Sequence, residues 1–134
     1  MNLIEGYRTM FYFLDAYYWK NKSDELGRLL GSMSLLSDNT PVDPAYEKGW
    51  EIAVSQIVGQ SNFNNLTADT VYRAMIAFLR NWSDLGTDGT ISRLCEDLEK
   101  SNPKSGEWLD SVKIVMQGND DPYQILKTKK CETE

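Results

Sequence analysis

The stretch Ile4-Glu5-Gly6-Tyr7-Arg8-Thr9-Met10-Phe11-Tyr12-Phe13-Leu14 decides the fold, because it recurs as Asp69-Thr70-Val71-Tyr72-Arg73-Ala74-Met75-Ile76-Ala77-Phe78-Leu79. Matched residues lie 65 positions apart, and five of them are identical: Tyr7 and Tyr72, Arg8 and Arg73, Met10 and Met75, Phe13 and Phe78, Leu14 and Leu79. The same offset pairs Leu26 with Ile91, Arg28 with Arg93, and Leu29 with Leu94. These matches indicate an internal duplication.

The third segment of the duplication is matched at a shorter offset. Trp50 and Val54 correspond to Trp108 and Val112 at an offset of 58, so the second copy has a shorter connection before this segment. Two copies of this length are too few for a solenoid. We therefore expect one pseudo-symmetric domain over residues 1–134, with copies at 3–58 and 67–117.

Apolar periodicity predicts an all-α bundle of about six or seven helices, built from two three-helix repeats. The first helix shows the pattern, because its apolar residues step by four and three: Leu3, Tyr7, Met10, Leu14 and Tyr17. Capping residues and breaks then set the ends of the others. The expected helices span residues 3–20, 24–36, 44–58, 68–82, 91–100, 106–117 and 121–128, with Ser23, Asp43, Thr67 and Thr90 as caps, Gly118 as a stop and a frayed tail.

Composition limits the class of protein. With 134 residues, 41% of them hydrophobic and 11% aromatic, the chain is long and apolar enough for a core. It has no apolar run near the ~20 residues that span a bilayer, so we expect a cytoplasmic protein. Cys95 falls at a core position of the repeat and is expected to be buried and reduced.

The net charge is −6, from 14 basic and 20 acidic residues. Such a surface disfavours nucleic acid and anionic membranes and favours a basic protein partner. Solubility alone is the alternative explanation for the excess of acid.

Catalytic and metal-binding patterns are missing from the sequence. The chain has no histidine and only two distant cysteines, which excludes the usual hydrolytic triads and zinc sites. Gly27-Arg28-Leu29-Leu30-Gly31 lies in a predicted helix without the lysine of a phosphate-binding loop. The remaining candidates for acid/base chemistry are three pairs of aspartates, and roles in turns and caps explain each of them: Asp38 with Asp43, Asp84 with Asp88, and Asp120 with Asp121. We expect no enzyme activity, no cofactor and no metal.

Two aromatic residues of the first helix fall opposite its buried stripe. With Met10 at the centre of that stripe, Tyr12 and Trp19 lie on the face expected to see solvent. The second copy has Ala77 and Asp84 at these positions, so the scaffold does not require aromatic side chains there. Exposed Tyr and Trp are typical anchors of protein interfaces. Cover by a seventh helix or by the tail is the alternative.

Four motifs resemble the immunity proteins of bacterial contact-dependent growth inhibition and related polymorphic toxin systems. They are Tyr-x-x-Met-x-x-Phe-Leu-x-x-Tyr-Tyr at 7–18, Ser-Asp-Glu-Leu-Gly-x-Leu-Leu at 23–30, Met-Ser-Leu-Leu-x-Asp at 33–38 and Pro-x-Asp-Pro-Ala-x-x-x-x-Trp at 41–50. The likeness is strongest over residues 3–54. It departs from the pattern at Asn39, at Tyr46, and at Asn102-Pro103-Lys104-Ser105 in the second copy.

The resemblance implies a cytoplasmic antidote that binds and neutralises a cognate toxin domain by occluding its active site. Toxins of this kind are often nucleases with basic clefts, which an acidic surface complements. We expect the contact at two acidic loops, Asp38 to Asp43 and Asp84 to Asp88, with the aromatic Tyr12 and Trp19 as secondary candidates. The alternative function is an acidic helical adaptor or regulator that binds a resident cytosolic protein.

Overall fold

The computed structural model describes residues 1–21, 23–36, 38, 40–59, 63–83, 89–101, 106–118 and 120. Within these residues the chain forms six helices: α1 (Leu3–Asn21), α2 (Asp24–Met33), α3 (Ala45–Val58), α4 (Ala68–Ser83), α5 (Thr90–Lys100) and α6 (Gly106–Met116). The predicted all-α bundle is confirmed. The predicted helix at 121–128 and the residues Asp84 and Asp88 lie outside the described part of the chain.

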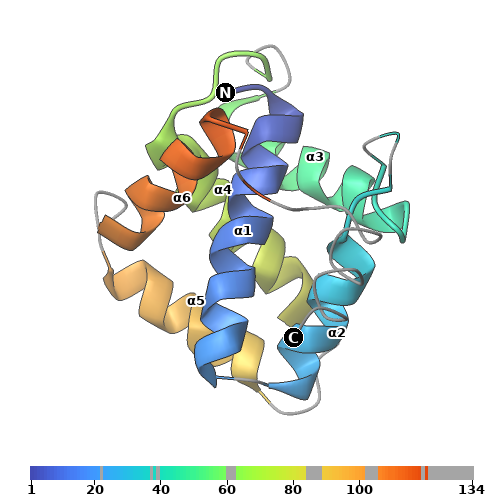
Figure 1. Cartoon of the computed structure of the whole chain (residues 1–134), viewed down its shortest axis with the longest axis vertical. Coiled ribbons are helices and arrows are strands. Elements are labelled where there is room, and N and C mark those ends of the chain that lie inside the picture. The colour runs from blue at the N-terminus through green and yellow to red at the C-terminus, as the bar shows by residue number, and fades with distance from the viewer. Residues whose placement is uncertain are drawn as a thin grey trace.

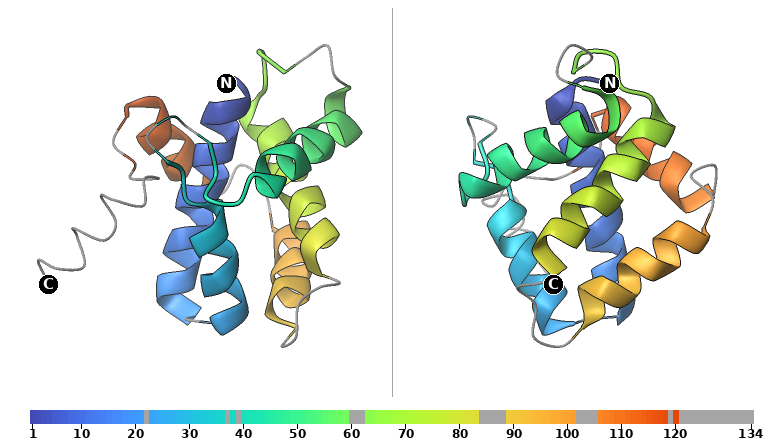
Figure 2. Two further views of the ribbon diagram at one scale, coloured as in Figure 1. Left: turned by 90° about the vertical axis from the view of Figure 1, so that its right-hand side faces the viewer. Right: turned by 180° about the vertical axis from the view of Figure 1, so that it is seen from behind.

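The helices form two layers, which the left view of Figure 2 shows edge-on. One layer contains α1, α2 and α6, and the other contains α3, α4 and α5. Helix α3 packs mainly on α4, and α6 packs mainly on α1 (Figure 1). The third helix of each predicted copy therefore lies against the first helix of the other copy.

Matched hydrogen bonds occur at the offsets of the predicted repeat. The Tyr7 hydroxyl donates to the Met33 carbonyl at 2.6 Å, and 65 residues later Tyr72 donates to Leu98 at 2.7 Å. The indole N–H groups behave likewise: Trp50 donates to Leu3 and Trp108 donates to Ala68, each at 3.0 Å. These bonds tie the ends of the helices together in both halves. The repeat as a whole stays a prediction from the sequence.

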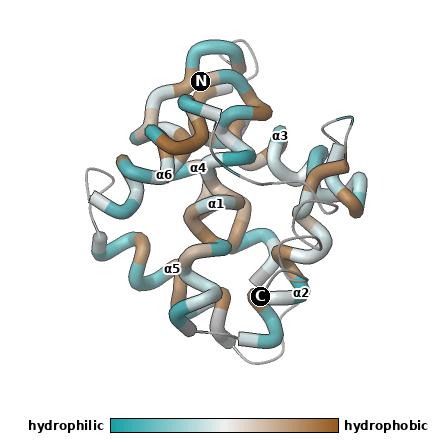
Figure 3. Tube along the Cα trace, in the orientation of Figure 1, coloured by the Kyte–Doolittle hydropathy of each residue, from teal (hydrophilic) through white to brown (hydrophobic). Residues whose placement is uncertain are grey.

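The core lies between the two layers and is rich in aromatic rings. Figure 3 shows apolar and polar residues alternating along α5 and α6, as expected for helices with one buried face. Phe13 and Tyr72 both make edge contacts with Trp108, with ring centroids 5.3 Å apart in each case. Cys95 is a buried free thiol, as predicted. None of the described helices has the length and apolar character needed to cross a bilayer.

Local capping explains most helix starts. Ser23 accepts a hydrogen bond from the Leu26 N–H at 3.3 Å, as an N-cap does, and Thr67 accepts one from the Thr70 N–H at 3.1 Å. The prediction of Thr90 as a cap is wrong. Thr90 is the first residue of α5, and Gly89 precedes it with a left-handed backbone at φ 74°.

Helix α2 ends at Met33, three residues earlier than predicted. Leu35 is not helical because it forms an antiparallel bridge with Pro41. Its apolar side chain is still buried, which is why periodicity alone extended the helix. Helix α3 starts at Ala45, one residue later than expected, so Pro44 occupies the N-cap position that was predicted for Asp43. The Asp43 carboxylate still accepts the Ala45 N–H at 3.1 Å.

Candidate functional site

The connection between α2 and α3 is a closely bonded loop that carries two of the predicted acidic residues. We call residues 34–43 the acidic loop; the structure describes all of it except residues 37 and 39. The Val42 N–H donates to Ser34 and the Leu36 N–H donates to Thr40, both at 2.8 Å. These bonds pair the two arms of the loop as in a hairpin. The loop therefore presents its outer side chains from a defined backbone.

Asp38 and Asp43 are both exposed on this loop. Asp38 accepts the backbone N–H of Thr40 at 3.1 Å and also its hydroxyl. These hydrogen bonds hold the pKa of the Asp38 carboxyl below its ordinary value. Asp38 and Asp43 each accept a hydrogen bond from a nearby backbone N–H and present their charge outward.

Apolar side chains stand beside these acids. Leu36 is 45% exposed and Val42 is 44% exposed. A pocket of about 120 Å³ opens next to the loop, with an apolar lining that includes Ile4 and Pro41 and with Glu47 and Glu51 of α3 in its wall. The acidic loop and the start of α3 thus form a surface that mixes negative charge with exposed apolar area, a combination that suits binding of a basic protein.

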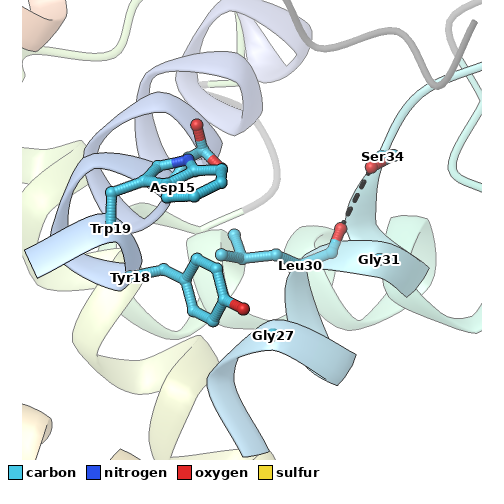
Figure 4. Close-up of a pocket in the computed structure, with 7 residues that line it drawn as sticks. All are labelled: Asp15, Tyr18, Trp19, Gly27, Leu30, Gly31 and Ser34. Carbon is cyan, nitrogen blue, oxygen red and sulfur yellow. Dashed lines mark hydrogen bonds between the residues drawn. The ribbon is translucent and has the colours of Figure 1, made fainter. Parts of the chain in front are cut away.

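A larger pocket of about 260 Å³ lies between the C-terminal half of α1 and α2. We call it the α1–α2 pocket. Figure 4 shows Tyr18 and Trp19 on its α1 side, with the Asp15 carboxyl next to the indole ring, and Leu30, Gly27 and Gly31 on its α2 side. Trp19 is 52% exposed and packs edge-on against Tyr18, with ring centroids 5.6 Å apart.

Helical spacing brings these groups together. Asp15 and Trp19 are four residues apart on α1, so they lie on the same face. Gly27 and Gly31 are likewise four apart on α2. A Cβ added to Gly27 would lie 3.0 Å from Cε1 of Tyr18, so the missing side chain lets the tyrosine ring lie against α2. The pocket is bounded by a ring on one wall and by backbone on the other.

The two surfaces meet at Ser34. This residue lines the α1–α2 pocket and also begins the acidic loop. Its hydroxyl donates to the Leu30 carbonyl at 3.1 Å, as the dashed line in Figure 4 marks, which fixes the junction. Ser34 therefore links the α1–α2 pocket to the acidic loop, on the side of the molecule where α2 and the start of α3 lie (Figure 1).

The predicted site residues are distributed unequally over these two surfaces. Asp38, Asp43 and Trp19 are exposed on them. Tyr12 is half-buried and is not among the residues that line either pocket. Asp84 and Asp88 fall outside the described residues, so their role in the contact stays a prediction.

Sequence reasoning missed the residues that shape the α1–α2 pocket. The predicted repeat contained the signal, because Gly27 corresponds to Ser92 and Gly31 corresponds to Glu96 at the offset of 65. Two helical glycines in one copy only are unexpected, since glycine inside a helix costs about 0.5–1 kcal/mol relative to alanine. Asp15, Tyr18, Glu47 and Glu51 gave no comparable signal, because acids and aromatics are common on helix surfaces.

Other chemistry is limited in the described part of the chain. It contains no group of three or more His, Cys, Asp or Glu side chains placed to hold a metal ion. Burial raises the pKa of the Cys95 thiol, which makes it a poor nucleophile. Burial is also the main cause of the raised pKa of Tyr7, and the nearby Tyr46, Glu47 and Asp43 raise it further. Both groups have structural roles in the core.

Comparison with models of protein families, with curated proteins and with solved structures found no match to this chain.

Proposed function

We propose that the chain is an immunity protein that binds and neutralises a cognate toxin domain of contact-dependent growth inhibition. The toxin domain is a nuclease, and the chain binds it in the cytoplasm and covers its basic active-site cleft. The proposal starts from the resemblance of residues 7–50 to such proteins. The structural observation that supports it best is the acidic loop, a defined backbone that exposes Asp38 and Asp43 beside Leu36 and Val42.

Electrostatics favours a basic partner on this side of the molecule. The net charge of −6 attracts a basic cleft at long range and speeds association. Glu47 and Glu51 extend the acidic surface from the loop onto α3. An antidote benefits from rapid capture, because the toxin acts as soon as it is free in the cytoplasm.

Short-range contacts then determine how long the complex lasts. Leu36, Val42 and Trp19 expose large apolar side chains within a region where acids also lie. Large side chains that become desolvated at an interface supply most of its binding energy, and truncation of a tryptophan at such a position typically costs about 2 kcal/mol or more. The combination gives both fast association and slow dissociation.

The test is to titrate the purified chain with the toxin domain encoded directly upstream of its gene. The variant pair Asp38→Asn with Asp43→Asn removes two charges and keeps side-chain oxygens for the bonds to Thr40 and Ala45. We expect the wild type to bind, and the double variant to associate roughly three- to ten-fold more slowly at low salt.

The matched control is Glu96→Gln with Asp97→Asn, which removes the same charge from exposed positions of α5 in the opposite layer. We expect it to change the association rate by less than half as much. Absence of binding by the wild type contradicts the proposal. Equal slowing by both double variants contradicts the location of the contact.

A further inference from the structure

We infer that the α1–α2 pocket receives an arginine side chain of the protein partner. The inference rests on the proposed function for the identity of that partner, and it adds the chemistry by which the partner is recognised. Three features of the pocket suit such a side chain: its aromatic rings, its carboxyl group and the open space over α2.

The lining of the pocket suits a planar cation. Trp19 and Tyr18 offer two rings at an interplanar angle of 72°, one of which is half exposed. A guanidinium group stacks on such rings and is attracted by their π faces, most strongly by tryptophan. The Asp15 carboxyl group beside the indole supplies the opposite charge (Figure 4). Arginine fits better than lysine because its flat head can stack and hydrogen-bond at the same time.

Gly31 lines the pocket without a side chain of its own. A Cβ added at this position would meet nothing within 4 Å, so no neighbour requires glycine there. Glycine inside a helix lowers stability relative to alanine, and packing gives no compensation at this position. The open space above Gly31 is therefore available to a side chain from outside, and the volume of about 260 Å³ accommodates a long one.

The predicted second copy uses the same positions differently. Asp15 corresponds to Arg80 and Ser34 corresponds to Glu99, and in the structure Arg80 and Glu99 form an ion pair between α4 and α5. Gly31 corresponds to Glu96, and Trp19 corresponds to Asp84. An ion pair thus links α4 and α5 in the second predicted copy, whereas an aromatic pocket lies between α1 and α2 in the first. The pocket is a feature that the fold itself does not need.

The position of the pocket points to a protein as the source of the cation. Ser34 connects it to the acidic loop, where Leu36 and Asp38 are exposed. A basic surface that covers the loop brings its own side chains over the pocket. A partner arginine then gains stacking on Trp19 together with pairing to Asp15, and an acidic protein of net charge −6 attracts it.

The first experiment uses no toxin. N-acetyl-arginine methylamide is titrated into 15N-labelled protein, and the Trp19 indole N–H signal, assigned with Trp19→Phe, reports binding. The neutral isostere N-acetyl-citrulline methylamide is the matched control. We expect saturable shifts at Trp19 with a millimolar Kd for arginine, at least five-fold weaker binding for citrulline and for Asp15→Asn, and intermediate binding for the lysine analogue. Equal shifts with arginine and citrulline would overturn the inference.

The second experiment fills the pocket. Gly31→Leu places a side chain in the open space, and Gly31→Ala is the matched control that restores helix propensity with a small group. We expect Gly31→Leu to weaken binding of the upstream toxin domain at least ten-fold at unchanged or increased Tm, while Gly31→Ala stays within about three-fold of wild type. Trp19→Ala, at an exposed position, gives the same loss by a second route.

The outcomes separate the two proposals. If the wild type does not bind the toxin domain, the proposed function fails and the arginine titration still decides the pocket. If the wild type and Gly31→Leu bind the toxin domain equally well while folded, the inference about the pocket is wrong and the immunity function stands.

Discussion

The substitution Tyr7→Phe tests how the helix ends are held together. It removes a hydroxyl that donates to the Met33 carbonyl at 2.6 Å, in a side chain that is only 2% exposed. Met33 is the last residue of α2, whose final carbonyls have no partner inside the helix. Among the described residues, no backbone N–H donates to the Met33 carbonyl. The phenylalanine variant therefore leaves a buried carbonyl without its donor.

The matched substitution Tyr72→Phe removes the corresponding bond to Leu98, at 2.7 Å. Here the carbonyl keeps a second donor, since the Ser101 N–H lies 3.2 Å from it. Loss of a buried hydrogen bond costs about 0.5–1.5 kcal/mol, and an unsatisfied buried group costs about 1–3 kcal/mol. We therefore expect the free energy of unfolding to fall by about 2 kcal/mol for Tyr7→Phe and by about 1 kcal/mol for Tyr72→Phe.

The assay is thermal and urea unfolding followed by circular dichroism at 222 nm. With about 2.1 cal/mol/K of unfolding entropy per residue over 134 residues, the expected decreases in Tm are about 7 °C and about 4 °C. Tyr12→Phe, at a half-buried position, is the control and is expected to change the free energy of unfolding by less than about 0.5 kcal/mol. Equal losses of unfolding free energy in the two variants, or a larger loss for Tyr72→Phe, would contradict the role of the Tyr7 hydroxyl as the donor to the Met33 carbonyl.

Three further predictions concern charge, pH and thiol chemistry. Arg8→Gln breaks the ion pair with Asp120, whose side chain is 1% exposed, and should lower the free energy of unfolding by about 2 kcal/mol. Arg73→Gln breaks the exposed ion pair with Asp69 and should lower it by only about 0.3–0.5 kcal/mol. Equal losses of the two variants in urea unfolding would contradict the structure. The pKa of Tyr7 is raised above its ordinary 10.0, so this side chain loses its proton first in the unfolded state, and the free energy of unfolding falls as the pH rises above about 10. Tyr7→Phe should reduce this pH dependence in urea titrations between pH 9 and 12. An unchanged pH dependence would exclude Tyr7 as its cause. The second cysteine of the sequence, Cys131, is replaced in a Cys131→Ser background so that Ellman's reagent reports on Cys95 alone. Cys95 should then react only as fast as the protein unfolds, because the thiol is buried and its pKa is raised; rapid reaction of the native protein would show that the position is open.

The helices could be predicted because each carries a regular apolar stripe. In α1 the apolar residues Leu3, Tyr7, Met10 and Leu14 follow the 3.6-residue period of a helix, and tertiary packing preserves the helix that this period predicts. The end of α2 could not be predicted in the same way. Leu35 continues the apolar period but is buried from a hairpin-like loop, and periodicity does not distinguish these two cases.

The candidate site was only partly predictable. Turn and cap patterns single out Asp38 and Asp43, and helical phase singles out Trp19 as an exposed aromatic, because each depends on a local rule. The pocket depends on how α1 and α2 lie against each other, since Gly27 and Gly31 become informative only when Tyr18 faces them. A local pattern contains no information about such contacts across two helices.

The most direct test of the account is growth rescue. Cells express the toxin domain encoded directly upstream of the gene, with or without this chain. We expect cells to survive with the wild type, and we expect the two proteins to co-purify. Death of the cells despite soluble expression of the chain would contradict the immunity function and would favour an adaptor that binds a resident protein.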